Sequence, residues 1–356
     1  MNKRTYSVIG LMSGTSCDGI DLAHCHFLEE KNEWRYKIVN TETINYSKKL
    51  RNKLISCGKT NSLTLKKLDN ELGKIFSESL VKFINKNKIS VDLISSHGHT
   101  VFHDIKLQLN HQIGNPLIIY KNTKVPTVHN FRELDVLHGG QGAPLVPYGE
   151  KKLFKGYDYC INIGGITNIS SLENKKSYGY DICPANIILN KYARKLGYDF
   201  DLDGKLSVRG KFKERLFSEL NHLKYYERTH PKSLDILYIE KNYYPLFKNY
   251  KPKDVLKTYI EHMAHQINSA INKKKSKVLL TGGGVFNNQI LKKINKFNKL
   301  DSNFIVPKKK IIIFKEAIIF GFLGLLRSLN KKNVGKEITG SSNSTSSGLI
   351  VDNKIL

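Results

Sequence analysis

The chain has little cysteine, and its cysteines are not spaced in pairs. The five cysteines, at positions 17, 25, 57, 160 and 183, make an odd number and form no C-x-x-C pair. Disulfide frameworks and zinc ribbons need such pairs, so both are disfavoured. No apolar run approaches the roughly 18 residues of a membrane span, and the first residues lack the apolar core of a signal peptide. We therefore expect a cytoplasmic protein with reduced thiols.

Arginine is scarce in an otherwise strongly basic sequence. Only nine of the 58 basic residues are arginine, although the formal net charge is +27. The lysines are mixed with asparagine and isoleucine along the whole chain, and no basic stripe interleaved with aromatic residues is present. This pattern indicates a composition bias, so we expect neither a nucleic-acid nor a membrane partner. The positive charge would still attract small anionic substrates.

The 356 residues are long enough for two domains, and one pattern of elements occurs twice. In the first third we expect strands and a long amphipathic helical stretch at about 6–11, 20–28, 35–46, 48–88 (helical) and 91–96. From the middle onward we expect strands at about 159–165, 166–172, 176–182 and 277–281, and helices at about 184–196, 211–223 and 252–274. A strand, a glycine loop and a second strand thus recur, which predicts two similar α/β halves with a ligand cleft between them. The polar tail, residues 331–356, is typical of a disordered end, although Gly348-Leu-Ile-Val351 could form a short strand.

The loop Gly10-Leu-Met-Ser-Gly-Thr-Ser-Cys-Asp-Gly-Ile-Asp21 lies between two apolar runs and predicts a phosphate-binding hairpin tip. Its small residues let backbone N–H groups approach phosphate oxygens, and the hydroxyl groups of Ser13, Thr15 and Ser16 add donors. Asp18 and Asp21 can hold Mg²⁺, directly or through water. No helix follows at once and the spacing differs, so this loop is not a P-loop.

Two further glycine loops follow strands, at Gly164-Gly165 and at Thr281-Gly-Gly-Gly-Val-Phe-Asn287. Alone, each is typical of an ordinary turn, but three in order indicate a nucleotide site. Asp181 ends a predicted strand, and Pro184 suits the first turn of the helix after it. Asp181 can therefore act as a general base, or it can cap that helix.

Two other clusters carry polar chemistry. His97, His99 and His103 have the spacing of a catalytic metal site, although no further set of ligands accompanies them. Arg132 can pair with a substrate carboxylate. It precedes Gly139-Gly-Gln-Gly-Ala-Pro-Leu-Val-Pro147, a run that suits a turn lining a cleft.

With these motifs, the sequence resembles the anhydro-N-acetylmuramic acid kinase family of the sugar kinase/actin/Hsp70-like ATPase superfamily. The resemblance covers nearly the whole chain. It rests on Gly10–Asp21, Ser96-His-Gly98, Phe131-Arg132 with Asp135, Gly139–Pro147, Asn162-Ile-Gly-Gly165 with Asn168, Asp181 with Pro184 and Asn186, Asp201-Leu-Asp-Gly204, Thr281-Gly-Gly-Gly284, Glu316-Ala317, Ile338-Thr-Gly-Ser341 and Gly348-Leu-Ile350.

The resemblance implies an α/β fold of two RNase H-like (actin-like ATPase) domains, with mixed sheets flanked by helices and an interdomain cleft. We expect the first domain at 1–135 with a returning segment at about 314–356, and the second at 136–313. The family suggests a homodimer. It also implies an ATP- and Mg²⁺-dependent transferase that opens the 1,6-anhydro ring with water and phosphorylates O6. The product is N-acetylmuramic acid 6-phosphate, formed in peptidoglycan recycling.

Residue by residue, the resemblance assigns these roles. Asp181 is the catalytic residue. The ATP-binding residues are Gly14, Thr15, Ser16, Cys17, Asp18, Gly19, Ile20, Asp21, Gly164, Gly165, Gly282, Gly283 and Gly284. The substrate-binding residues are Arg132, His97, Gln141, Asn186 and Glu316.

The chain departs from the family pattern beside the sugar, at His99, Asn130, Ile182, Cys183 and Ala185. Three alternatives therefore stay open: a kinase for another sugar or acyl group, a non-catalytic nucleotide-binding regulator, and a metal-dependent hydrolase that uses the histidine cluster.

Overall fold

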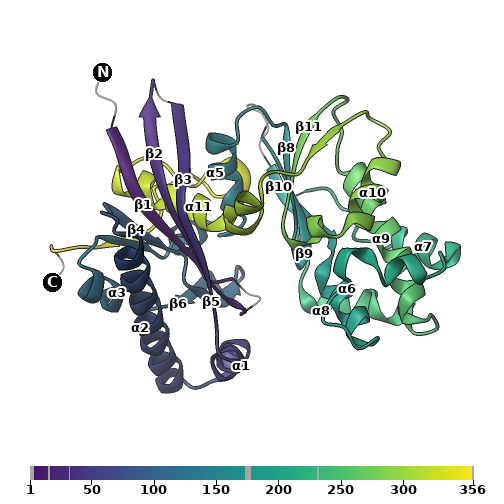
Figure 1. Ribbon diagram of the computed structural model, residues 1–356, viewed down its shortest axis with the longest axis horizontal. Helices are drawn as coiled ribbons and strands as arrows, with labels where there is room; N and C mark the ends of the chain where they lie inside the picture. The colour runs from purple at the N-terminus through teal and green to yellow at the C-terminus, as the bar shows by residue number, and fades with distance from the viewer. Residues whose placement is uncertain (1–3, 15–16, 32, 173–177, 231, 355–356) are drawn as a thin grey trace. The chain divides into compact units, whose positions relative to one another are not determined.

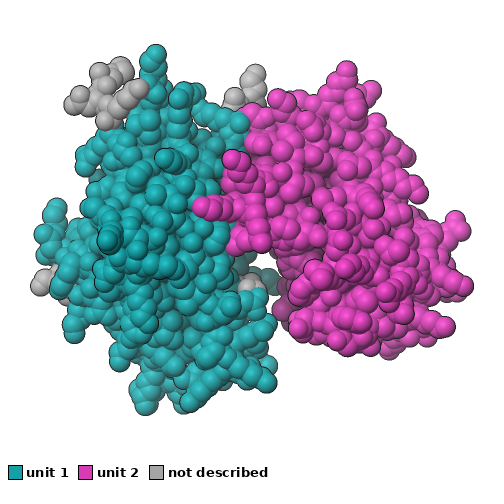
Figure 2. Space-filling model, in the orientation of Figure 1, with its two compact units in different colours: residues 1–155, 314–356 teal, residues 156–313 magenta. Residues whose placement is uncertain are grey.

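The computed structural model describes residues 4–354, except residues 15, 16, 32, 173–177 and 231. The chain divides into two compact units, which Figure 2 shows in different colours. Unit 1 comprises residues 1–155 and 314–356, and unit 2 comprises residues 156–313. From the sequence we expected the first boundary after residue 135, whereas the contacts place it after Lys155.

The later boundary is explained by helix α5 (Val146–Leu153), which packs on strand β3 (Glu33–Asn45) of unit 1. Its Glu150 forms an ion pair with Lys315, with 2.7 Å between Nζ and Oε1, and both side chains are almost fully buried. A Cβ atom at Gly149 would lie only 2.5 Å from Cγ2 of Ile319. Helix α5 is therefore fixed to unit 1.

The sheet of unit 1 has the strand order β13-β7-β4-β1-β2-β3. Its strands are β1 (Arg4–Met12), β2 (Gly19–Glu30), β3, β4 (Leu93–Ser96), β7 (Thr127–His129) and β13 (Leu349–Val351). Strands β1, β2 and β3 form an antiparallel meander, and β4 and β7 run parallel to β1 on its other side. The first three predicted strands are confirmed, and each is slightly longer than expected.

Alternating side chains of β1 divide the two faces of this sheet. Ile9 and Leu11 belong to an apolar core that they share with helices α1 (Lys48–Ser56), α2 (Ser62–Asn87) and α3 (Pro116–Thr123). This alternation follows from the two-residue repeat of a strand. Figure 1 shows α2 and α3 along one face of the sheet and α11 (Lys309–Ser328) on the other.

Helix α11 approaches β1 without intervening side chains. A Cβ atom at Gly10 would lie 1.8 Å from the carbonyl oxygen of Ala317 and 2.9 Å from the amide nitrogen of Gly321. Only glycine fits at Gly10, because its missing Cβ leaves room for the helix backbone. The Ser95 hydroxyl on β4 also donates to the Phe320 carbonyl at 2.5 Å.

The polar tail is ordered through residue 354, so the expectation of a disordered end is wrong. It contains helix α12 (Lys336–Thr339) and strand β13, which pairs antiparallel with β7 as its residues allowed. Its polar groups have specific partners. The Asn333 side chain, for example, bonds to Leu323 and to both backbone groups of Ser347.

The sheet of unit 2 has the order β10-β9-β8-β11-β12. Its strands are β8 (Tyr159–Ile163), β9 (Ile166–Ser171), β10 (Tyr178–Pro184), β11 (Lys277–Thr281) and β12 (Asn303–Ile305). As in unit 1, three antiparallel strands come first, and two parallel strands then extend the sheet from the first of them. The internal repeat expected from the sequence is therefore present in the strand order.

Helix α9 (Pro252–Ser269) is central to the helical layer of unit 2. It contacts three others, α6 (Asn186–Arg194), α7 (Glu214–Asn221) and α10 (Asn288–Lys296). Helix α8 (Ile236–Asn242) lies in the same layer (Figure 1). The remaining elements belong to unit 1: β5 (His99–Asp104) and β6 (Leu109–Ile113), which form a separate two-stranded ribbon, and α4 (Glu133–Leu137). The sequence analysis gave no sign of this ribbon.

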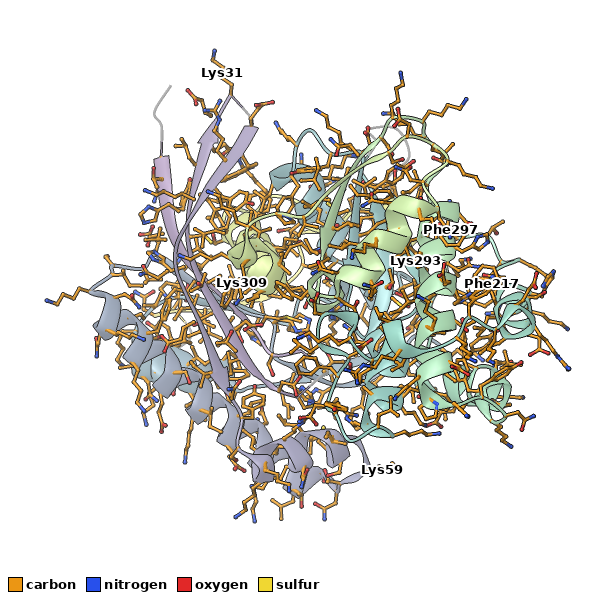
Figure 3. All side chains as sticks on the ribbon, turned by 45° about the vertical axis from the view of Figure 1, so that its right-hand side comes forward. Lys31, Lys59, Phe217, Lys293, Phe297 and Lys309 are labelled. Carbon is orange, nitrogen blue, oxygen red and sulfur yellow. The ribbon has the colours of Figure 1, made fainter. Side chains whose placement is uncertain are left out.

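The lysines are distributed and not gathered. Lys31 and Lys59 are both exposed and point outward at opposite ends of unit 1 (Figure 3). Across the part of the chain that the structure describes, no helix is both long and apolar enough to cross a bilayer.

Candidate active site

The loop between β1 and β2 contains the first group of predicted ATP-binding residues. Thr15 and Ser16 lie outside the described residues. Cys17 has a left-handed backbone (φ 55°), and its N–H donates to the Gly14 carbonyl at 3.2 Å, which closes a tight turn. The hydroxyl of Ser13 is buried against the Tyr46 hydroxyl at 2.7 Å. The expectation that Ser13 offers a phosphate donor is therefore wrong.

Gly19 and Ile20 attach this loop to the sheet. A Cβ atom at Gly19 would lie 2.3 Å from the Ile44 carbonyl oxygen. Ile20 is fully buried in the core of unit 1. Only the backbone groups of these two residues can face a ligand.

The two aspartates predicted to hold Mg²⁺ differ in their surroundings. The Asp18 carboxylate is more than half exposed and pairs with Arg51 at 2.9 Å. Asp21 is more enclosed, and its only printed side-chain partner is the Thr43 hydroxyl, which donates to Oδ1 at 2.5 Å. Burial raises the pKa of Asp21, and the Thr43 hydrogen bond only partly opposes that shift.

Asp21 fits a cation better than Asp18 does. The negative charge of Asp21 also raises the pKa of Glu316, so the two carboxyl groups repel each other. A bound cation would relieve that repulsion, and Mg²⁺ commonly uses one or two carboxylates together with water and substrate phosphates. One Asp18 oxygen is already engaged by Arg51. Among the described residues no three His, Cys, Asp or Glu side chains converge as a metal site.

His97 and Arg132 form a buried pair at the ends of β4 and β7. Nε and Nη2 of Arg132 lie 3.2 and 2.8 Å from Nε2 of His97, while Nδ1 of His97 lies 2.9 Å from the Gly98 carbonyl. Burial, together with the charge of Arg132, lowers the pKa of His97 well below its ordinary value. The ring is therefore neutral, and we assign its proton to Nδ1, so that Nε2 accepts from Arg132.

This pairing contradicts the metal-site alternative for the histidine cluster. The Nε2 lone pair of His97 faces a guanidinium, and Nδ1 of His103 bonds to the Asn110 amide at 2.8 Å. His99 is buried on β5. The three imidazoles thus do not converge as a ligand set within the described structure.

A glycine-rich loop and the tail hold Arg132 from the other side. Nη1 of Arg132 donates to the Gly142 carbonyl at 2.7 Å, and the Gly142 N–H donates to the buried carboxylate of Asp135 at 2.8 Å. The Gln141 N–H donates to the Thr339 carbonyl at 2.9 Å. The side chain of Gln141 makes no hydrogen bond to a described residue, so it is available to a ligand.

Glu316 follows from the close approach of α11 to β1, since it immediately precedes Ala317. Burial raises its pKa, while the charges of Lys315 and Arg132 lower it. Burial conversely lowers the pKa of Arg132 to about 10, so the guanidinium stays charged at neutral pH. Unit 1 thus brings together four predicted residues with complementary charges: Asp21, His97, Arg132 and Glu316.

In unit 2, Asp181 lies at an irregularity of β10. It pairs with Asn168 of β9, and the register then shifts before Cys183. Backbone contacts fix it, because its N–H donates to Lys232 and its carbonyl accepts from the Tyr225 hydroxyl at 2.5 Å. Oδ2 accepts from the Leu234 N–H at 2.9 Å. Oδ1 has no partner among the residues described.

The reading of Asp181 as a helix cap is wrong. Helix α6 begins at Asn186, its N-cap is Ala185, and Pro184 ends β10 instead of opening the helix. Burial raises the pKa of Asp181 to about 6, against the opposing effect of the Leu234 N–H. The carboxyl group therefore titrates close to neutral pH, as a general base requires.

The two glycine loops of unit 2 lie together. Gly282 (φ 85°) and Gly284 are so close to the end of β8 that Cβ atoms there would lie 2.6 Å from the Ile163 carbonyl oxygen and 2.2 Å from its Cγ2. The carbonyls of Gly164 and Gly165 accept from Asn186 and Ala185, at 3.1 and 2.8 Å. The N–H groups of Gly164 and Gly165 donate to no described residue, so they remain available to an anion.

A pocket of about 250 Å³ opens beside these glycines, between α6, α10 and the segment around Asp201. Its lining includes Asn186, Gly283, Gly284, Phe286 and Asp203. Oδ1 of Asp203 is buried there without a hydrogen-bond partner among the described side chains and backbone. Asp203 received no role from the sequence, although it belongs to a stretch on which the family resemblance rests.

The site residues that sequence reasoning missed lie mostly in unit 1. Ser96, Asn110, Gln112 and His129 line a second cavity next to His97. Ser96 and His129 directly follow or end strands, which is a signal in itself. Asn110 and Gln112 belong to the unexpected ribbon and carried none.

Known proteins resemble this chain over nearly its full length. A family model described as anhydro-N-acetylmuramic acid kinase matches residues 6–353. A protein of that name from Caldanaerobacter subterraneus subsp. tengcongensis is 30% identical, covering 90% of this chain and 91% of its own. Another, from Hydrogenovibrio crunogenus, is 32% identical, covering 80% and 81%.

A solved structure, component A of the (R)-2-hydroxyglutaryl-CoA dehydratase of Acidaminococcus fermentans, aligns over 91% of this chain and 99% of its own. The identity is 11% and the TM-score 0.46. That likeness is weak, so the assignment rests on the sequence matches. On those matches, the chain belongs to the anhydro-N-acetylmuramic acid kinase family.

Proposed function

We propose that this protein opens the 1,6-anhydro ring of 1,6-anhydro-N-acetylmuramic acid with water and transfers the γ-phosphoryl group of ATP to O6. The products are N-acetylmuramic acid 6-phosphate and ADP, formed in the cytoplasm during peptidoglycan recycling. The observation that carries this proposal is Asp181, a carboxyl group fixed by backbone contacts whose pKa burial raises to about 6.

Asp181 is the general base. Oδ1 takes a proton from the water that attacks C1, and the bond between C1 and O6 breaks. The second proton of the water stays on the new anomeric hydroxyl. Activation of water by one carboxylate follows the logic of inverting glycosidases. The freed O6 then attacks the γ-phosphorus, and the bond to the ADP oxygen breaks.

Arg132, His97, Gln141 and Glu316 bind the sugar. The Arg132 guanidinium is held on three nitrogens, so it offers its remaining N–H groups in a fixed direction to the lactyl carboxylate. The raised pKa of Glu316 favours a carboxyl group that exchanges hydrogen bonds with sugar hydroxyl groups.

ATP is bound by backbone groups of both units. We assign phosphate contacts to the loop Gly14–Asp21 and to the available N–H groups of Gly164 and Gly165. We assign the adenosine to the pocket beside Gly282, Gly283 and Gly284, where Asp203 offers an unpartnered oxygen to a ribose hydroxyl. Asp21, with Asp18 through water, would hold Mg²⁺, which when bound neutralises charge that develops on the phosphates.

The test is a coupled assay of ADP release with 1,6-anhydro-N-acetylmuramic acid and with N-acetylmuramic acid, run in oxygen-18 water. We expect turnover of the anhydro sugar, with the label at C1 and none in the phosphoryl group. Turnover of N-acetylmuramic acid alone would contradict the ring-opening step. Tight ATP binding without turnover of either sugar would instead indicate a nucleotide-binding regulator.

A further inference from the structure

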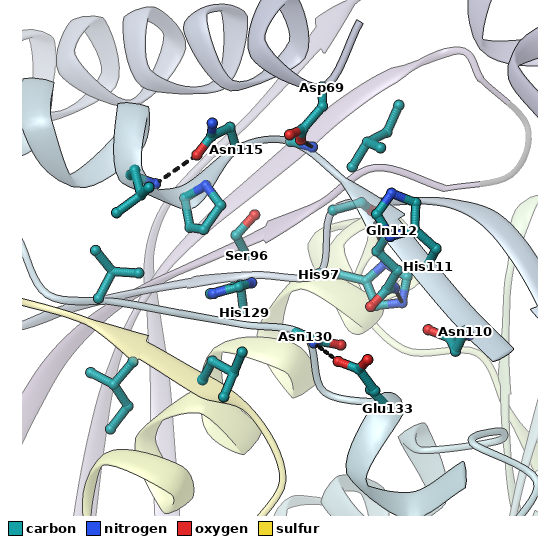
Figure 4. Close-up of a pocket in the computed structure, with 18 of the residues that line it drawn as sticks. Asp69, Ser96, His97, Asn110, His111, Gln112, Asn115, His129, Asn130 and Glu133 are labelled. Carbon is teal, nitrogen blue, oxygen red and sulfur yellow. Dashed lines mark hydrogen bonds between the residues drawn. The ribbon is translucent and has the colours of Figure 1, made fainter. Parts of the chain in front are cut away.

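A groove of about 660 Å³ lies in unit 1 beside the carboxyl ends of β4 and β7. Its walls come from β6, the start of α3, β7 and β13 (Figure 4). His97 lines one part of it, and the same ring accepts hydrogen bonds from Arg132. The groove therefore continues from residues to which we assign sugar binding.

Three side-chain oxygens in this groove are buried without partners: Oγ of Ser96, Oδ1 of Asn110 and Oε1 of Gln112. Ser96 is 1% exposed and Asn110 is 5% exposed. Figure 4 shows Ser96 between Asn115 and His97 in the middle of the groove. Since buried polar atoms are nearly always hydrogen-bonded, three such atoms in one cavity indicate that a ligand supplies the partners.

Neighbouring contacts determine which atom of each amide remains without a partner. The Gln112 amide nitrogen faces Nε2 of His97 at 3.1 Å and the Thr100 hydroxyl at 3.3 Å, which leaves its oxygen for a ligand. The Asn110 amide nitrogen is engaged by His103. His129 makes no hydrogen bond within the described structure, and burial lowers its pKa to about 4, so its ring is neutral at pH 7.

The charged groups of the groove are already matched. Asp69 pairs with Lys66 at 2.6 Å and accepts from the Gly114 N–H at 2.9 Å. Glu133 accepts from Asn130, and Arg327 donates to the Gly348 carbonyl and to Asn330. A second charged ligand group would therefore find no free counter-charge here, whereas an uncharged group with N–H or O–H donors would.

Part of the groove is apolar. Leu349 and Ile350 of β13 and Pro116 and Leu117 at the start of α3 belong to its lining. A ligand group that combines an N–H donor with a methyl group meets both kinds of surface. An acetamido group has that composition.

We propose that this groove binds the acetamido side of the sugar, with Ser96, Asn110 and Gln112 as hydrogen-bond partners and β13 with α3 against the methyl group. This inference rests on the proposed function, since it assigns a part of that substrate. It makes these three side chains determinants of specificity for N-acetylated sugars.

The experiment compares kcat/KM for 1,6-anhydro-N-acetylmuramic acid with that for the analogue that carries hydrogen in place of the acetamido group. We expect Ser96→Ala and Asn110→Ala each to reduce the preference for the acetylated sugar five- to tenfold. Each should leave KM for ATP unchanged. The melting temperature of Ser96→Ala should not fall, because the hydroxyl that it removes has no partner in the protein. Ser79→Ala, a buried serine of α2 outside the groove, is the matched control and should keep the parental preference.

A preference unchanged in both variants would overturn the inference while leaving the proposed kinase intact. If the parent protein turned over neither sugar, the proposed function would fail, and calorimetry with N-acetylmuramic acid would test the groove alone. Weaker binding by Ser96→Ala than by the parent would then support the groove. No binding by the parent, or equal binding by both, would refute it.

Discussion

The hydroxyl of Thr339 donates a 2.7 Å hydrogen bond to the buried carboxylate of Asp135, although 204 positions separate the two residues in the sequence. The other Asp135 oxygen accepts from the Gly142 N–H, and the Gly142 carbonyl accepts from Arg132. The tail is thereby connected to the guanidinium that we assign to the sugar.

We predict that Thr339→Val lowers the free energy of unfolding by about 2 kcal/mol, because a hydrogen bond to a buried charge is lost. KM for the sugar should rise severalfold, since Gly142 and Arg132 lose part of their support, while KM for ATP stays the same. Thermal unfolding and steady-state kinetics measure the two effects. Thr339→Ser keeps the hydroxyl and should behave as the parent. A Val variant with parental stability and KM would disprove the connection.

Asp181→Asn should reduce kcat at least a hundredfold, because a carboxamide cannot accept the proton of the attacking water. ATP binding, measured by calorimetry, should be unchanged. Asp158→Asn is a suitable control in the same unit, since that carboxylate pairs with Lys273 at the surface. Activity of Asp181→Asn within a few-fold of the parent would refute the assignment of the base.

The pH profile should follow the same carboxyl group. The pKa of Asp181 is raised to about 6, and the base is the deprotonated form, so activity is present above that pH. As the pH falls through 6, kcat/KM should decrease, approaching tenfold for each further pH unit. Rates measured between about pH 4.5 and 8 test this expectation. A profile without an acidic limb in that window would mean that another group limits the reaction.

Gly282→Ala should weaken ATP binding at least tenfold. The new Cβ would lie 2.6 Å from the Ile163 carbonyl oxygen, so the strand end beside the nucleotide pocket must move. Gly197→Ala is the matched control, because Gly197 has nearly the same φ (83° against 85°) but no atom within 4 Å of the added Cβ. Both variants carry backbone strain of about 1–2 kcal/mol, and only the first carries the clash. Equal ATP affinity in both would show that the pocket does not hold the nucleotide.

Local sequence patterns predicted the strands, the glycine loops and Asp181, because each depends on residues that are neighbours in the chain. The β5–β6 ribbon was missed because His99–Asp104 and Leu109–Ile113 show no regular alternation of polar and apolar residues. The groove was missed with it, since Asn110 and Gln112 belong to that ribbon.

The tail was misjudged for a different physical reason. Its serine, threonine and asparagine residues have the composition of a disordered end. In the fold, however, they bond to partners such as Asp135 and Leu323. Composition records how polar a segment is, but it does not record whether distant backbone and carboxylate groups are positioned to receive its hydrogen bonds.

The contact of Gly10 with the backbone of α11 has a mechanical consequence. Because Ala317 and Gly321 touch the strand without intervening side chains, the helix cannot rotate about its axis or slide without a steric clash. Strand and helix therefore move as one rigid piece. Glu316, one residue before the contact, and Asp21, on the neighbouring strand, keep a constant spacing through any motion of that piece. The electrostatic repulsion between the two carboxyl groups is in this sense built into the backbone.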